Sequence, residues 1–353
     1  MPTARIWFDI LTPKQILFFG PLVKSLRKEE CDVLVTSRAY RELEPLAEMA
    51  GLKLTFVGER GGKGKEAQLV ASTERQSLII PIARDFDPQV AVSVASGVCA
   101  RVAFGLGAKH IAVNDSPHSE IAGRLSLPLS HHLLCPWVIP KSAWGIYGLA
   151  PRQVSTYRAL DPAAWLKRPA LGGPVPKLKS GKKTITIRAP ESDAPYLAKA
   201  DSSFMRKVLG AIAKGFAAHN LVVLGRYDQQ VLQLQKEFGE TFIVPDGPID
   251  GASLLKKSDA FVGMGGTMNA EAALLGVPTV SAFQGSLYTD RYLLSEGILS
   301  RAGTPASIVK TLGRILRDDF KAAQERKAMK ILDWMEDPVA VLQSFILKAA
   351  MQA

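Results

Sequence analysis

The residues between positions 262 and 280 (VGMGGTMNAEAALLGVPTV) have the spacing that points most specifically to chemistry in this chain. They begin with an apolar run, which predicts a buried strand, and continue with a glycine turn and a helix. Glycine has no Cβ atom, so the N–H groups of such a turn can approach a ligand closely, and the helix N-terminus favours an anion such as phosphate. We therefore predict an anion site at Gly265, Gly266 and Thr267. On glycine content alone, a tight turn that binds nothing is an equal alternative.

Candidate bases occur in the first half of the chain, each after a predicted strand. Asp9 ends the first strand, and Asp115 and His118 lie in the segment NDSPH that follows a later one. Carboxylates and imidazoles act as general bases, so Asp115 or His118 could take a proton from an acceptor hydroxyl, and Asp9 is expected on the same side of the sheet. The alternative for each residue is capping or turn chemistry, which Asp and Asn often perform.

Three further motifs suggest chemistry but fail on their context. The loop at 58–65 (GERGGKGK) resembles a phosphate loop, yet Glu66 stands where that motif requires Ser or Thr, so we interpret it as a surface loop. The D-x-D sequence at 85–87 matches a metal-binding motif but precedes its strand, which predicts the wrong edge of the sheet. We expect no metal site. The histidine pair at 131–132 lies beside an apolar run and is interpreted as structural.

Strands and helices alternate along the first half of the chain. The first helix is predicted to start with a capping box, in which Thr12 is the N-cap, Pro13 the first helical residue and Gln15 the residue that reaches back; Pro21 should kink this helix. Strands separated by helices indicate a parallel sheet with helices on both faces. The apolar runs predict strands at 5–10, 32–36, 52–57, 90–94 and 110–113.

The region at 143–183 interrupts this alternation, because it is rich in proline and glycine and ends in KLKSGKK, which is typical of an interdomain linker. The alternation resumes at 184, where apolar runs predict strands at 184–188, 221–224 and 242–244. We predict an α/β fold of two Rossmann-like domains that face a cleft, with the last helices crossing back to the first domain. The expected parts are an N-terminal domain at 1–165, a linker at 166–183, a C-terminal domain at 184–319 and the returning helices at 320–353.

The composition is that of a soluble globular protein, with 47% hydrophobic and 22% charged residues among 353, enough for two domains with their own cores. No apolar run reaches the roughly eighteen residues of a membrane span, and no signal peptide precedes the first predicted strand. Cys31, Cys99 and Cys135 lie far apart, which favours reduced thiols and argues against a zinc site. We expect a cytoplasmic protein.

The formal net charge of +11 fits a nucleic acid, an anionic membrane surface or a phosphorylated substrate as partner. The sequence has no helix-turn-helix, zinc-finger spacing or paired aromatic-basic strand signature, so phosphorylated small molecules and a membrane surface rank above nucleic acid. A peripheral position at a membrane surface fits the same charge. The sequence leaves the oligomeric state open.

The second half resembles the nucleotide-sugar domain of glycosyltransferases with the two-Rossmann (GT-B) fold, notably the peptidoglycan N-acetylglucosaminyl transferase. The first half is similar to non-hydrolysing UDP-N-acetylglucosamine epimerases through the segment FDILTPKQILFFGPLVKSL, and Arg188 corresponds to an Arg of their phosphate site. The whole chain most closely resembles an uncharacterised, mainly archaeal family with openings like WFDILTPKQ and the motif GGTMNAEAALLG. The elements shared with the transferases are Gly265-Gly266, Glu271, Gly276-x-Pro278, Phe283-Gln284 and Asp290-Arg291.

The resemblance implies roles for several residues. Glu271 would bind ribose hydroxyls, since a carboxylate can accept two hydrogen bonds, and the Gly265–Thr267 turn would hold a diphosphate. Arg188 would add a charge-assisted contact, and Gln284 and Asp290 would contact sugar hydroxyls. The alternatives are an exposed helix residue for Glu271, a surface ion pair for Arg188 and a polar loop for the last two. No cofactor is implied; the nucleotide-sugar, UDP-linked by this resemblance, is the substrate.

The resemblance implies a metal-independent glycosyltransferase that binds its nucleotide-sugar donor on the C-terminal domain and its acceptor, a membrane-associated molecule or a glycan, on the N-terminal domain. A sugar-nucleotide epimerase is one alternative, but Ser96 lies near the position of the catalytic Asp of that family and cannot replace it as an acid-base group. A non-catalytic nucleotide or nucleotide-sugar binding protein, such as a sensor, is the other alternative.

Overall fold

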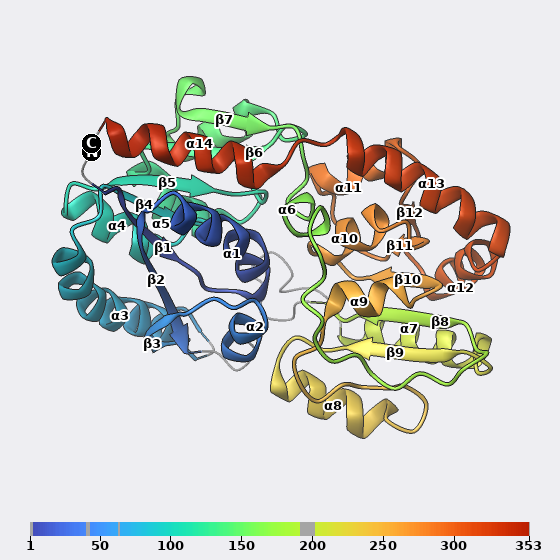
Figure 1. The fold of residues 1–353 in the computed structure, drawn as a ribbon. Helices are drawn as coiled ribbons and strands as arrows, with labels where there is room; N and C mark the ends of the chain where they lie inside the picture. Colours follow the sequence, from blue (N-terminus) through green and yellow to red (C-terminus); the bar gives the residue numbers. More distant parts are fainter. Residues whose placement is uncertain (1–2, 40–42, 63, 191–201, 353) are drawn as a thin grey trace. The chain divides into compact units, whose positions relative to one another are not determined.

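The computed structural model describes residues 3–39, 43–62, 64–190 and 202–352. In this described part, the chain divides into two compact α/β units, coloured along the sequence in Figure 1. The first unit comprises Met1–Trp165 and Glu336–Ala353, and the second comprises Leu166–Met335. The predicted fold class, two Rossmann-like units with parallel sheets, is confirmed.

The first unit is built on a parallel sheet that has seven strands among the described residues, in the order β3-β2-β1-β4-β5-β6-β7. Its centre is apolar on both faces, and Ile6, Trp7 and Phe8 of β1 are fully buried. Such a run is typical of a strand covered by helices on both sides. The strands are β1 (Arg5–Asp9), β2 (Asp32–Ala39), β3 (Thr55–Glu59), β4 (Val90–Ser93), β5 (Lys109–Val113), β6 (His132–Pro136) and β7 (Val154–Tyr157).

The helices of the first unit include one from the far end of the chain. The C-terminal helix α14 packs on α1 and β4, where Ser25 donates a 2.7 Å hydrogen bond to Gln343 (Figure 1). The α-helices are α1 (Pro13–Lys28), α2 (Leu43–Met49), α3 (Lys65–Phe86), α4 (Gly97–Gly105), α5 (Glu120–Ser126), α6 (Ala163–Leu166) and α14 (Pro338–Met351). The 3-10 helices are η1 (Leu127–Leu129), η2 (Lys141–Tyr147) and η3 (Pro151–Gln153).

Helix α1 begins at Pro13 as predicted, but its cap differs from the predicted capping box. The side-chain oxygen of Gln15 accepts a 2.7 Å hydrogen bond from the N–H of Leu11, one residue before the expected Thr12. The Thr12 hydroxyl forms no capping bond with any described residue. The helix continues through Pro21 to Lys28 without a break.

Three strands were not predicted: β6 and β7 of the first unit and the two-residue β12 (Ser300–Arg301) of the second. β6 has five residues and ends at Pro136, and β7 has four. β7 is the edge strand and pairs with β6, so the first part of the proline- and glycine-rich region belongs to the first unit. His132, interpreted as structural, lies on β6, where its Nε2 is 2.9 Å from the Ser155 hydroxyl and its ring contacts Phe345.

The second unit is built on a parallel sheet with five strands among the described residues, in the order β12-β11-β10-β8-β9. The predicted strand near 242–244 forms only an isolated bridge between Val222 and Ile243. The strands are β8 (Thr184–Arg188), β9 (Asn220–Leu224), β10 (Ala260–Gly263), β11 (Thr279–Ser281) and β12 (Ser300–Arg301). The helices are α7 (Ser202–Gly215), α8 (Asp228–Phe238), α9 (Gly251–Lys256), α10 (Met268–Leu274), α11 (Tyr288–Ser295), α12 (Pro305–Ile315) and α13 (Asp318–Trp334).

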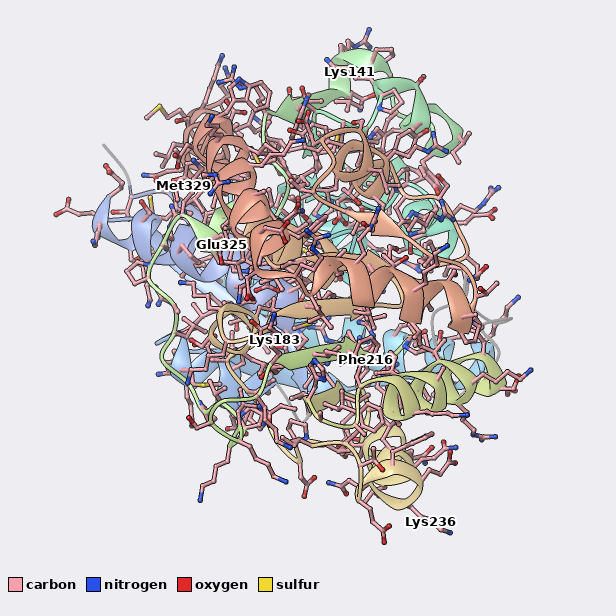
Figure 2. All side chains as sticks on the ribbon, turned by 90° about the vertical axis from the view of Figure 1, so that its right-hand side faces the viewer. Lys141, Lys183, Phe216, Lys236, Glu325 and Met329 are labelled. Carbon is pink, nitrogen blue, oxygen red and sulfur yellow. The ribbon has the colours of Figure 1, made fainter. Side chains whose placement is uncertain are left out.

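The C-terminal helices divide between the two units. Helix α13 packs on α10, and a Cβ atom on Gly276 would lie 2.6 Å from the Cα of Glu325, so only glycine allows this approach (Figure 2). Lys183 ties the same region to the sheet through a 2.7 Å ion pair with Asp318. The segment from 320 was expected to pack on the first unit as a whole; it does so only from Glu336.

The segment expected to be a free linker is part of the second unit. The Asn220 side chain donates hydrogen bonds to the carbonyls of Lys179 and Lys182, and Asp250 accepts one from the N–H of Gly172. These contacts hold the proline-rich chain along the unit. Among the described residues, no helix is long and apolar enough to cross a membrane.

Candidate functional site

In the second unit, the carboxyl ends of three adjacent strands carry the predicted anion-binding groups. Arg188 is the last residue of β8 and is in register with Leu224 of β9 and Gly263 of β10. Because the strands are parallel, the residues that follow them lie at one edge of the sheet, which is where ligands bind in such folds. The structure therefore brings Arg188 to the same edge as the Gly265–Thr267 turn.

The glycine turn depends on glycine for its conformation and for its packing. Gly265 has φ +104° and Gly266 has φ +95°, values that other residues rarely adopt. A Cβ on Gly265 would lie 3.0 Å from the Phe283 ring, and a Cβ on Gly266 would lie 2.7 Å from Nη2 of Arg226. Thr267 is the N-cap of the short helix α10.

Arg226, which the sequence interpretation did not single out, links the loops at this edge. Its Nη2 donates a 3.2 Å hydrogen bond to the carbonyl of Gly265, and its Nε donates to the carbonyl of Ala189. Arg188 donates a 2.7 Å hydrogen bond to the carbonyl of Gly225. The sequence could have indicated this residue, because Arg226 lies two positions after the predicted strand at 221–224 and Arg188 ends its own strand.

Glu271 lies one turn into α10, as predicted, and its N–H donates to the carbonyl of Thr267. The residue is only 7% exposed, so it is more enclosed than a carboxylate on an open face.

Asp290 and Gln284 differ in how far a sugar could reach them. Asp290 is buried, and its Oδ2 accepts hydrogen bonds from Ser281 (3.0 Å) and Asn269 (3.4 Å). Burial raises the pKa of Asp290, against the effect of these two bonds. In the structure the Asp290 carboxylate holds α10, β11 and α11 together, and its expected contact with sugar hydroxyls stays a prediction. Gln284 is exposed, and its amide donates to the carbonyls of Ala282 and Gly303.

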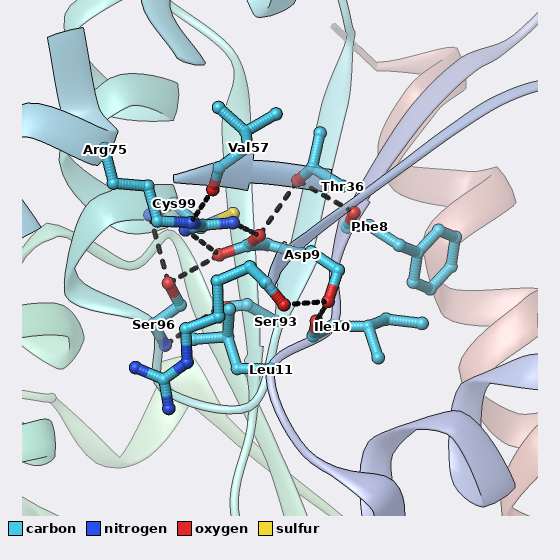
Figure 3. A network of polar contacts seen from close by, with 12 residues as sticks. Phe8, Asp9, Ile10, Leu11, Thr36, Val57, Arg75, Ser93, Ser96 and Cys99 are labelled. Carbon is cyan, nitrogen blue, oxygen red and sulfur yellow. Dashed lines mark hydrogen bonds and ion pairs between the residues drawn. The ribbon is translucent and has the colours of Figure 1, made fainter. Parts of the chain in front are cut away.

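In the first unit, Asp9 lies at the centre of a buried polar network (Figure 3). Arg75 donates to both carboxylate oxygens, at 2.6 and 3.1 Å, and the hydroxyls of Thr36 and Ser96 donate at 2.9 and 2.7 Å. A carboxylate offers about four acceptor positions, so these four donors occupy them, and Asp9 is 0% exposed. The expectation that Asp9 is a candidate base is corrected: the carboxylate has neither a free acceptor position nor contact with solvent.

Asp115 lies two residues after β5 and is accessible. Its side chain is 15% exposed, its Oδ2 is 2.6 Å from the Lys14 ammonium, and its Oδ1 accepts a 2.8 Å hydrogen bond from Ser116. Burial opposes the ionised form of Asp115, but the Lys14 charge outweighs it, and the pKa falls below its usual value. His118 stands at the surface nearby; partial burial lowers its pKa, and the Asp115 charge opposes this shift.

Lys14 joins Asp115 to a second carboxylate that the sequence interpretation missed. The Lys14 ammonium is 2.7 Å from Oδ2 of Asp161, and the Tyr157 hydroxyl donates a 2.6 Å hydrogen bond to Oδ1 of Asp161. We call Lys14, Asp115, Tyr157 and Asp161 the Lys14 cluster. Asp161 fell in the region interpreted as linker. Lys14 could have been identified from the sequence, because it lies in the first turn of the helix that follows β1, at the carboxyl edge of the sheet.

The glycine-rich loop after β3 borders an open hollow of about 870 Å³ against α3. A Cβ on Gly61 would lie 2.8 Å from the carbonyl oxygen of Ala67, so this glycine allows the loop to pack on the first turns of α3. Arg60 and Lys65 line the hollow together with Glu59, Glu66 and Glu74, so its charges are mixed. This packing agrees with the interpretation as a surface loop.

The D-x-D segment lies at the amino end of β4, as expected from its position before the strand. Asp87 pairs with Arg5 at 2.6 Å, and Asp85 pairs with Arg84 at 3.3 Å, both on the surface. Within the described ranges, no group of three or more His, Cys, Asp and Glu side chains is arranged to hold a metal ion.

The chain has two Rossmann-like units, each with a parallel sheet and with polar groups at its strand ends. These features define a protein with the GT-B-like fold. The chain belongs to the DUF354 family, a family of proteins of unknown function, whose profile matches residues 4–350. It is 29% identical over 305 residues to the uncharacterized protein MJ0665 of Methanocaldococcus jannaschii, with 84% of this chain and 87% of that protein covered. The resemblance to an uncharacterised family is thereby confirmed.

Solved structures with the same fold include epimerases and glycosyltransferases. The chain has a TM-score of 0.78 and 15% identity to a candidate UDP-N-acetylglucosamine 2-epimerase of Listeria monocytogenes, covering 99% of this chain and 97% of that one. For the UDP-GlcNAc 2-epimerase of Neisseria meningitidis, bound to UDP-GlcNAc, the TM-score is 0.75 and the identity 14%, with 99% of this chain and 100% of that one covered. For the spinosyn rhamnosyltransferase SpnG, complexed with thymidine diphosphate, the TM-score is 0.62 and the identity 15%, with 97% of this chain and 100% of that one covered. At these identities the similarity establishes the fold.

Proposed function

We propose that the protein is a metal-independent glycosyltransferase that binds a nucleotide-sugar donor on its second unit. The observation that carries this proposal is the edge at which Arg188, Arg226 and the Gly265–Thr267 turn come together. Two guanidinium groups and the backbone N–H groups of a glycine turn suit the oxygens of a diphosphate. Similar folds in proteins bound to UDP-GlcNAc and thymidine diphosphate support a nucleotide diphosphate as the ligand class.

The charge of the leaving group explains why such a site needs no metal ion. When the bond between the sugar and the diphosphate breaks, the departing oxygen becomes more negative. Fixed cations and N–H dipoles that already point at this oxygen stabilise the transition state without reorganising. Arg226 is held by two loop carbonyls and is thus positioned before the ligand arrives. We assign Glu271 to the ribose hydroxyls in this proposal and Gln284 to the sugar.

The acceptor is proposed to bind on the first unit, where Asp115 or His118 removes a proton from its hydroxyl group. The net charge of +11 favours an acceptor with negative charge, or one that is presented at an anionic membrane surface.

An epimerase is the second candidate, because the TM-scores to the epimerases (0.75 and 0.78) exceed those to the transferases, such as 0.62. Ser96 argues against it. Its hydroxyl donates to Asp9 and accepts from the N–H of Cys99, where it caps α4. A residue in this position stabilises the fold and cannot act as an acid-base group.

The proposal is tested by calorimetric titration with UDP, thymidine diphosphate and UDP-GlcNAc in EDTA, followed by assays of donor consumption with cell-extract acceptors. Arg226→Gln should weaken nucleotide binding by about 1.5–3 kcal/mol, the range for a hydrogen bond to a charged group. Arg206→Gln is the matched control, because Arg206 is exposed on α7 and pairs with Glu237. Equal losses in the two variants, or donor binding only with added metal, would contradict the proposal. Binding of a nucleotide-sugar without its consumption would favour the alternative of a non-catalytic sensor.

A further inference from the structure

The Lys14 cluster places one ammonium between two carboxylates at the carboxyl end of the first sheet, at 2.6 and 2.7 Å. We infer that Lys14 is a positioning residue that makes Asp115, rather than His118, the group that removes the proton from the acceptor hydroxyl. This inference rests on the proposed function, because it assigns the base of the proposed transfer.

Asp115 has the free acceptor positions that a base requires. Among the described residues, two donors bind its carboxylate, Lys14 on Oδ2 and Ser116 on Oδ1, against about four acceptor positions on a carboxylate. Its side chain is 15% exposed, whereas that of Asp161 is 4% exposed. A hydroxyl can therefore reach Asp115, and Asp161 can act only through Lys14.

Lys14 orients the carboxylate and also offers a further donor. An ammonium carries three N–H donors, and two of them meet Asp115 and Asp161. Among the described residues the third has no partner, and the Lys14 side chain is 21% exposed. Lys14 is thus able to hold the oxygen of an acceptor hydroxyl while Asp115 takes its hydrogen.

Two of the other titratable groups around the cluster are neutral at neutral pH. Burial raises the pKa of Cys135 to about 12 and that of Tyr157 well above its usual value, so both stay neutral. Burial also raises the pKa of Asp161, although Lys14 opposes this. The charge of Asp115 therefore depends on a short set of neighbours. The titratable groups that face it are Lys14, His118, Cys135, Tyr157 and Asp161.

The proposed step conserves atoms and charge. The acceptor oxygen forms a bond to the anomeric carbon of the donor as its proton passes to a carboxylate oxygen of Asp115. The bond between the anomeric carbon and the diphosphate oxygen breaks, and its electron pair leaves with the nucleoside diphosphate. Asp115 then loses the proton to water, and no oxidant or reductant takes part.

The positioning residue Lys14 should shift the pH dependence, and Asp161 should not. Transfer requires ionised Asp115, so the rate rises with pH through the pKa of this group. Loss of the Lys14 charge raises that pKa and moves the acidic limb of the profile to higher pH, by about 1 unit or more. Loss of Asp161 should leave the limb in place, because burial raises the pKa of Asp161 while Lys14 lowers that of Asp115, so Asp161 is mostly protonated where Asp115 titrates. A purely structural role of Lys14 would not move the limb together with the Asp115 pKa.

The test combines two measurements on the full chain. The first is the ¹³C NMR titration of labelled aspartate carboxyls, with Asp115 assigned by its loss in Asp115→Asn. The second is the pH profile of kcat/KM for donor consumption. The variants are Lys14→Met, Lys14→Gln, Lys14→Arg and Asp161→Asn, and Lys28→Met is the control, since it removes one exposed lysine from the end of the same helix.

We expect the Asp115 pKa and the acidic limb to rise together in Lys14→Met and Lys14→Gln, to return in Lys14→Arg, and to stay unchanged in Asp161→Asn. The donor KM should change less than twofold. If the Asp115 pKa shifts but the rate profile does not follow, Asp115 is not the base. If the pKa does not shift, the positioning role is overturned. If the wild type binds donor but consumes none, the proposed function fails. The NMR titration then still reports whether Lys14 pairs with Asp115.

Discussion

Asp9 and Asp115 are both aspartates at the carboxyl edge of the first sheet, yet their surroundings give them different roles. Asp9 is fully buried and receives four hydrogen bonds, two of them from Arg75. Asp115 receives two and remains in contact with solvent. The position of a carboxylate after a strand thus indicates a candidate base, and the number of donors around it decides whether it can act as one.

We predict that Asp9→Asn destabilises the protein by about 3–5 kcal/mol, because it leaves the buried Arg75 guanidinium without its counter-charge. Asp87→Asn should cost at most about 1 kcal/mol, since its pair with Arg5 is on the surface. Denaturant unfolding of the two variants at pH 7 measures both values. Similar losses would show that the buried pair contributes no more than an exposed one.

The buried His110 should make the protein sensitive to acid. Burial lowers its pKa to about 4, against the opposing charge of Asp9, and the hydroxyls of Ser93 and Ser130 each lie 2.9 Å from a ring nitrogen. The unfolded chain binds a proton near pH 6.5, so stability is lost as pH falls from about 6.5 towards 4. The expected loss from this group is about 2–3 kcal/mol at pH 4.5. In His110→Gln the difference between pH 7.5 and pH 4.5 should be smaller by this amount; an unchanged difference excludes His110.

At the scale of elements, the turn after β10 depends on close approach. Gly266 has a positive φ, and a Cβ at this position would collide with the Arg226 guanidinium. The backbone of this turn therefore packs against a side chain from another loop, and the proposed anion site should be lost if Gly266 or Arg226 is replaced.

We predict that Gly266→Ala weakens UDP binding at least tenfold, because the methyl group displaces Arg226 and the residue resists a positive φ, at a cost of about 1–2 kcal/mol. Gly210→Ala is the control, since Gly210 lies inside α7 and its new methyl group would have no described atom within 4 Å beyond its own helix backbone and chain neighbours. Calorimetry and thermal unfolding give the two readouts. Unchanged UDP affinity in a folded Gly266→Ala protein would remove the turn from the site.

The alternation of apolar runs predicted the central strands of both sheets, because buried parallel strands are continuous apolar segments. The strands β6, β7 and β12 escaped prediction because they are short, and β6 and β7 also lie beside proline residues. The glycine turn after β10 could be predicted from local spacing. Arg75 and Asp161 could not, because each gains its role from a partner far along the chain.

At the scale of the molecule, helix α14 belongs to the first unit, although the 170 residues of the second unit, Leu166 to Met335, separate it from the rest of that unit in the sequence. Val339, Leu342 and Ile346 are buried in the first unit. The stability of the N-terminal sheet therefore depends on the last described helix.

We expect Leu342→Ala to cost about 2–5 kcal/mol, the usual range for a buried leucine, and to act on the first unit. Hydrogen exchange should show faster opening of α1 and β4, the elements that α14 covers. Leu312→Ala, in the core of the second unit, should have its effect on α7 and β11 instead. Faster exchange in the same elements for both variants would mean that the units do not open separately.

The discontinuous first unit also has a consequence for the order of synthesis. A ribosome adds residues from the N-terminus, so the strands of the first unit emerge early but wait for Glu336–Ala353 to cover them. The second unit is one uninterrupted segment and can complete its core as soon as residue 335 has left the exit tunnel. The part of the protein that is made first is thus finished last, and until then its uncovered apolar face is open to chaperones.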